Sequence, residues 1–184
     1  MDAFEQVIEQ ILAREGYWTR TEVKVELTKE EKVEIGRPTA PRWELDVVGY
    51  RPKDNKILVV ECKSYLDSPG VHVDDLQPSS KRASRYKLFT EPVLRKVVFR
   101  RLARQLRNKG LCTVRPKVRL GLAVGKVAGS VSDIERLFAK NNWRLLTPDW
   151  IRERLLEIPG TGYENEVANV VAKLLFPVKS KRGR

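Results

Sequence analysis

The chain has 184 residues, of which 41% are hydrophobic and 33% are charged, and this suits one folded domain of ordinary size. No stretch of 18 apolar residues occurs, which excludes a membrane-spanning helix. The first residues lack the basic start and apolar run of a secretory signal, and two cysteines are too few for a disulfide framework. We therefore expect a cytoplasmic protein with no membrane partner.

The positive charge is concentrated in one segment. The whole chain carries 36 Lys and Arg against 24 Asp and Glu, a net charge of +12. Between Lys81 and Arg119 there are 14 basic residues and a single acid, Glu91, so this segment holds essentially all of the surplus. Such a block favours a polyanion, because binding to phosphates releases counterions. We expect DNA as the partner, and the alternative is a solvated basic face that only maintains solubility.

Hydrophobic spacing and turn residues predict the secondary structure of the first half of the chain. The expected elements are a helix over 3–15, a strand over 17–27, a long turn over 29–42 that could hold a short strand around 33–35, and two strands over 43–50 and 57–63.

The second half follows from the same signals, including a capping box at Ser132–Glu135 and a Thr147-Pro148 helix start. The expected elements are a mobile loop over 66–90, a helix over 93–109, a strand over 118–127, a helix over 132–140, a strand over 143–146, and helices over 148–156 and 164–176. Alternation of helices and strands after the third strand predicts an α/β fold with helices flanking a mixed sheet.

Three charged residues on two neighbouring strands form the main candidate site. Side chains alternate along a strand, so Glu61 and Lys63 share one face while Cys62 points into the core. Asp46 lies on the preceding strand. Charges on a central strand are costly unless they pair or bind a metal, and two carboxylates with a backbone carbonyl suit Mg²⁺. The alternative is a salt-bridged strand pair without catalysis.

Asp46, separated by fourteen residues from Glu61-Cys62-Lys63 at the end of an apolar strand, resembles the PD-(D/E)XK nuclease superfamily, in its Holliday-junction-resolvase and Mrr-like branch. The resemblance implies a restriction-endonuclease-like αβββαβ core over about 3–127. It implies that Asp46, Glu61 and the carbonyl of Cys62 bind Mg²⁺, with Mn²⁺ as a substitute, and that Lys63 handles the attacking water. Leu45 stands where the family often has proline, and 29–42 would be an insertion.

The family also places a glutamate on the first helix, eleven residues before a glycine-aromatic pair. Glu5 has this spacing to Gly16-Tyr17, and Glu9 is the reserve. Both could equally be surface charges favoured near a helix N-terminus.

On the helix over 93–109, four basic residues lie opposite the apolar stripe and are expected to contact DNA phosphates: Lys96, Arg100, Arg104 and Arg107. Gln105 falls inside the apolar arc, where it is either a hydrogen-bonded core residue or a group that faces the site.

These observations together predict a single nuclease-like domain over 1–176, with a C-terminal extension over 130–176 and a basic tail over 177–184. The expected activity is metal-dependent DNA hydrolysis, as an endonuclease. The alternatives are a non-catalytic DNA-binding or RNA-binding module on the same fold. A homodimer is expected only by analogy with the family.

Overall fold

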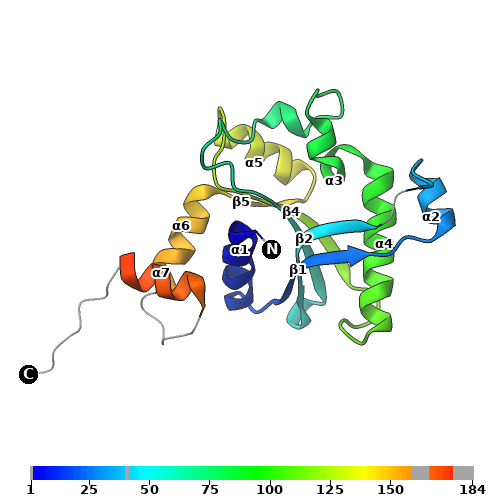
Figure 1. Ribbon diagram of the computed structural model, residues 1–184, viewed down its shortest axis with the longest axis horizontal. Coiled ribbons are helices and arrows are strands. Elements are labelled where there is room, and N and C mark those ends of the chain that lie inside the picture. The colour runs from blue at the N-terminus through cyan, green and yellow to red at the C-terminus, as the bar shows by residue number, and fades with distance from the viewer. Residues whose placement is uncertain (1, 40–41, 159–165, 176–184) are drawn as a thin grey trace, which may run out of the picture.

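One five-stranded mixed sheet organises the molecule, which is α/β (Figure 1). The computed structural model describes residues 2–39, 42–158 and 166–175. The strands lie side by side in chain order: β1 (Trp18–Val25), β2 (Trp43–Arg51), β3 (Lys56–Lys63), β4 (Lys117–Val124) and β5 (Arg144–Leu146). The pairs β1–β2 and β2–β3 are antiparallel, and the pairs β3–β4 and β4–β5 are parallel.

Alternation along β3 assigns its side chains to the two faces of the sheet. Leu58 and Val60 pack against helix α1 (Ala3–Arg14), whose buried residues are Ile8, Ile11 and Leu12. Ile57 and Val59 pack on the other face, against α4 (Pro92–Asn108), which buries Leu94, Val97, Val98 and Leu102. The two longest helices of the described residues therefore cover opposite faces of the sheet.

The C-terminal elements extend the same layers. Helix α5 (Val131–Lys140) leads to β5 at the edge of the sheet, and α6 (Pro148–Glu157) and α7 (Val167–Leu175) pack on the side of α1. Thr147 caps α6 by accepting a hydrogen bond from the Trp150 amide, as its sequence signal indicated. The predicted tail over 177–184 lies outside the described residues, as do residues 164, 165 and 176 of the last predicted helix.

Two sequence predictions about loops are wrong. The segment predicted as a turn contains helix α2 (Lys29–Glu34) instead of a short strand at 33–35, and Thr28 and Glu31 form its capping box. The segment over 66–90 is not a bare loop, because it contains η2 (Val73–Leu76), η3 (Ala83–Arg85) and α3 (Lys87–Thr90). Its buried hydrophobic side chains contribute to the core beneath α4: Val71, Leu76, Tyr86, Leu88 and Phe89.

The short helix η1 (Pro52–Asp54) makes the turn between β2 and β3. No helix among the described residues is both long and apolar enough to cross a membrane.

Candidate active site

Strands β2 and β3 separate at Asp46, and this separation forms the candidate site. Their pairing ends at Val47 opposite Val60, although Asp46 would be the next residue in register with Glu61. Instead of a backbone carbonyl, the Oδ2 atom of Asp46 accepts a hydrogen bond from the Cys62 amide at 2.7 Å. The Asp46 carboxylate thus accepts the hydrogen bond that a backbone carbonyl of β2 would accept in a continuous strand pair.

A local irregularity turns Asp46 toward β3. Leu45 and Val47 are two residues apart, yet they pack on opposite faces of the sheet, so the regular alternation is broken at Asp46. On the neighbouring strand, Glu22 lies between the paired residues Thr21 and Val23 and has a φ of 51°, a left-handed value that is unfavourable for a glutamate. Strained backbone of this kind is concentrated at functional sites.

Cys62 contributes its backbone to the site while its side chain lies in the core. The thiol packs with the residues beneath α1, and burial raises the pKa of Cys62. In an extended strand the N–H and C=O groups of one residue point toward the same neighbouring strand. Since the Cys62 amide points to Asp46, the Cys62 carbonyl also lies on the side of β3 from which β2 has separated.

Glu61 and Lys63 lie on the same face of β3, as alternation predicted. Their Oε1 and Nζ atoms are 2.7 Å apart, and each side chain is only 19% exposed. Burial and repulsion from Asp46 raise the pKa of Glu61, against the attraction of Lys63. Burial by itself would lower the pKa of Lys63, but the ion pair with Glu61 and the charge of Asp46 outweigh it, so this pKa is raised. Lys63 is therefore protonated.

Asp46 is also shifted toward its neutral form. Burial is the largest cause and raises the pKa of Asp46, while the hydrogen bond from Cys62 and the charge of Lys63 act in the opposite direction. The site therefore holds two buried carboxyl groups against one ammonium group. A bound cation would supply the missing positive charge.

Helix α1 brings Glu5 toward this pair. Burial, followed by repulsion from Asp46 and Asp2, raises the pKa of Glu5. Glu9 lies one turn further along α1 and is half-buried. Of the two alternatives, Glu5 is thus the glutamate that interacts with Asp46. We call Glu5, Asp46, Glu61, Cys62 and Lys63 the carboxylate site.

Two further residues, Glu22 and Tyr65, lie near this site. The charge of Glu22 adds to the causes that raise the pKa of Glu5, and no short sequence pattern predicts this long-range influence. Tyr65 follows Lys63 with a φ of 43°, and its hydroxyl accepts a 3.4 Å hydrogen bond from the buried Tyr86. This hydrogen bond holds the segment that follows β3 against the core.

The oxygen donors of the carboxylate site fit a hard divalent cation in their chemistry. The Asp46 and Glu61 carboxylates and the Cys62 carbonyl belong to the class of ligands that Mg²⁺ prefers. Within the described ranges, no group of three or more His, Cys, Asp or Glu side chains is arranged to hold a metal ion. Any metal here would therefore depend on two carboxylates together with backbone oxygen and water.

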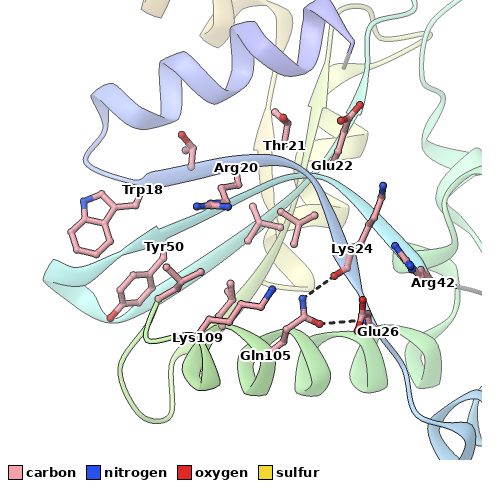
Figure 2. Close-up of a pocket in the computed structure, with 15 residues that line it drawn as sticks. Trp18, Arg20, Thr21, Glu22, Lys24, Glu26, Arg42, Tyr50, Gln105 and Lys109 are labelled. Atoms are coloured by element: carbon pink, nitrogen blue, oxygen red, sulfur yellow. Dashed lines mark hydrogen bonds between the residues drawn. The ribbon is translucent and has the colours of Figure 1, made fainter.

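Gln105 lies away from the carboxylate site. Its Nε2 atom donates to the Lys24 carbonyl at 2.8 Å, and its Oε1 atom accepts from the Glu26 amide at 3.2 Å. These bonds attach α4 to the end of β1 (Figure 2). Gln105 is a hydrogen-bonded structural residue in this arrangement.

The four predicted DNA-binding residues are all exposed on α4, but they differ in their partners. Arg100 pairs with Glu34 of α2 at 2.7 Å, and the neighbouring Arg101 pairs with Glu31 at the same distance. In the described part of the chain, no acidic side chain is in ion-pair contact with Lys96, Arg104 or Arg107. Helix α2 therefore neutralises Arg100 and Arg101 on the basic face of α4. Lys96, Arg104 and Arg107 form the open part of this face.

Comparisons with known proteins assign no family. No family model matches the sequence, and neither does any curated protein. One solved structure, the crystal structure of a protein of unknown function called AF1548, is similar over 93% of this chain and 74% of that chain. The identity is 15% and the TM-score is 0.46, so this similarity carries no argument about function.

Proposed function

We propose that this protein is a metal-dependent DNA endonuclease with a restriction-endonuclease-like core. The observation that carries the proposal is the carboxylate site, where Asp46 bonds to the Cys62 amide at 2.7 Å beside the buried Glu61–Lys63 pair. Apart from α2 and the short helices of the connecting loops, the elements follow the order α1, β1, β2, β3, α4, β4. This supports the proposal, because the same order is expected for PD-(D/E)XK nucleases.

The groups of the carboxylate site are ones that hydrolysis of a phosphodiester would use. A Mg²⁺ ion held by Asp46, Glu61 and the Cys62 carbonyl would supply Lewis-acid stabilisation and an activated water. The ammonium group of Lys63 is held by Glu61 at 2.7 Å, so it can donate a hydrogen bond to a phosphate oxygen or orient the attacking water. Glu5 can hold a water molecule on the side of α1. The open part of the basic face, Lys96, Arg104 and Arg107, would hold the DNA backbone.

The test is a cleavage assay on linear, supercoiled and branched DNA over a range of Mg²⁺ and Mn²⁺ concentrations. We expect Asp46→Asn and Lys63→Ala each to reduce cleavage at least about 100-fold while DNA affinity stays nearly unchanged. Asn retains an oxygen that can accept the Cys62 hydrogen bond, so Asp46→Asn should keep its fold.

The matched control is Asp54→Asn, which makes the same chemical change at the opposite end of β2 and β3 and should cleave like the wild type. No cleavage by a folded wild-type sample with either metal would reject the proposal. Loss of DNA binding in both site variants would show that the residues are assigned to the wrong role.

A non-catalytic DNA-binding module is the second candidate. The observation that favours it is that the described residues contain no group of three side chains suited to hold a metal. Calorimetry distinguishes the two candidates. A saturable Mg²⁺ or Mn²⁺ site that disappears in Asp46→Asn favours the enzyme, and the absence of metal binding favours the module.

A further inference from the structure

A groove runs between the edge strand β1 and the C-terminal half of α4 (Figure 2). It has a volume of about 350 Å³, and β1 forms one wall along residues 18–24. Gln105, Leu106 and Lys109 of α4 form the opposite wall, with Leu111 beyond the end of the helix. We call this the β1–α4 groove. It lies on the face of the sheet opposite α1.

The charge of the groove favours an anionic ligand. Four exposed basic residues line it, namely Arg20, Lys24, Arg42 and Lys109, against the two acids Glu22 and Glu26. Within the described residues, none of the four basic groups is held in an ion pair by an acidic side chain. Figure 2 shows Arg20 from β1 and Lys109 from α4 extending into the space between the two elements. The groove also adjoins Arg104, so it continues the open part of the basic face.

The aromatic ring of Trp18 lies at one end of the groove. Trp18 is 69% exposed, whereas the other three tryptophans of the chain are half-buried. Its ring makes an edge contact with Tyr50, with ring centroids 6.2 Å apart, which restricts its orientation. A flat, exposed and oriented ring beside basic groups can stack with a nucleic-acid base.

The other end of the groove leads toward the carboxylate site. Glu22 lines the groove, and its neighbours Thr21 and Val23 pair with Val47 and Leu45, the two residues that flank Asp46. Trp18 is four residues from Glu22 along β1, or about 13 Å at roughly 3.3 Å per residue. A strand of nucleic acid in the groove would therefore extend only a few nucleotides from the proposed point of cleavage.

We propose that the β1–α4 groove binds single-stranded DNA next to the cleavage point, with a base stacked on Trp18 and phosphates contacted by Arg20, Arg42 and Lys109. This rests on the proposed nuclease function. An unpaired base is required because bases within a duplex already stack on each other and do not present their faces to Trp18. The preferred substrate would thus be branched, flapped or frayed DNA rather than an uninterrupted duplex.

The experiment measures binding of a fluorescently labelled oligothymidylate and of a blunt duplex by anisotropy, in EDTA so that no cleavage occurs. Trp18→Ala should weaken single-strand binding about tenfold and leave duplex binding nearly unchanged. Trp18→Phe retains a stacking ring and should keep most of the affinity. Arg20→Gln with Lys109→Gln should lower the salt dependence of single-strand binding by about 1 in log–log slope.

Val33→Ala is the matched control, because Val33 on α2 is similarly exposed at 67% and does not line the groove. Intrinsic fluorescence gives a second readout, since stacking should quench Trp18 and Trp18→Phe should remove that quenching. The proposal is overturned if Trp18→Ala binds single strands like the wild type, if single strands do not bind, or if both DNA forms weaken equally. These results do not depend on metal, so they remain readable if no cleavage is found.

Discussion

Strands β2 and β3 carry a charged cluster at each end, and the two clusters differ in their balance of charge. At the turn, Asp54 lies between two cations, with 2.8 Å to Arg51 and 2.7 Å to Lys56. These hydrogen bonds, first from Arg51 and then from Lys56, lower the pKa of Asp54. At the other end, Asp46 and Glu61 share one cation, Lys63, and burial raises the pKa of both carboxyl groups.

This difference separates a structural ion-pair cluster from a candidate site. The turn cluster has enough cations and is accessible to solvent, so it stabilises the turn without needing a ligand. The carboxylate site contains more buried negative groups than its cation can neutralise, and such an arrangement destabilises the folded protein unless a ligand relieves it. A cost of this kind is typical of functional sites.

The largest expected difference between the two clusters comes from removing one cation from each of them. Lys63→Met leaves Asp46 and Glu61 without a positive partner, so we expect the free energy of unfolding to fall by about 2 kcal/mol. Lys56→Met, at a side chain that is 41% exposed, should have no measurable effect. Urea denaturation of both variants in EDTA checks this. Equal stability of the two variants would contradict the distinction between the two clusters.

The same distinction between paired and open charge applies along α4. Arg104→Gln with Arg107→Gln should weaken duplex binding about tenfold and reduce the log–log salt slope by about 2, because both groups are open to phosphate. Arg100→Gln should have a smaller effect, because Glu34 already holds Arg100 at 2.7 Å. Anisotropy titrations at several salt concentrations provide the measurement. An Arg100 effect as large as that of the double variant would mean that DNA displaces Glu34.

The smallest expected effect is on the pH dependence of the free energy of unfolding. The change with pH should have opposite signs for Asp46 in the carboxylate site and Asp54 in the turn cluster. The folded-state pKa of Asp46 is raised, so the free energy of unfolding falls as pH rises from its unfolded to its folded pKa. The folded-state pKa of Asp54 is lowered, so its contribution is present above the unfolded pKa and is lost in acid.

Thermal unfolding from acid to neutral pH, in EDTA, tests these signs. Relative to the wild type, Asp46→Asn should gain stability as the pH rises from the unfolded toward the folded pKa of Asp46. Asp54→Asn should lose stability, relative to the wild type, over the more acidic range from the folded to the unfolded pKa of Asp54. The same direction in both variants would show that the environments of the two carboxyl groups are not opposite. Added Mg²⁺ should reduce the difference between Asp46→Asn and the wild type by favouring the ionised site.

Local patterns in the sequence determined much of the fold and the residue types of the site. Period-two alternation placed Glu61 and Lys63 on one face of β3, with Cys62 on the other, and their 2.7 Å ion pair confirms the shared face. Helical spacing predicted the apolar faces of α1 and α4. These predictions succeed because side-chain direction in helices and strands follows from backbone geometry over a few residues.

Tertiary structure decided the features that depend on distant parts of the chain. Helix α2 buries no side chain, and its Glu31 and Glu34 bind arginines that lie more than sixty residues later, so a local search for apolar spacing misses it. The bond from Cys62 to Asp46 depends on where β2 separates from β3, and Gln105 acts through backbone groups of β1. Long-range pairing across the fold sets these contacts, and no short sequence pattern encodes it.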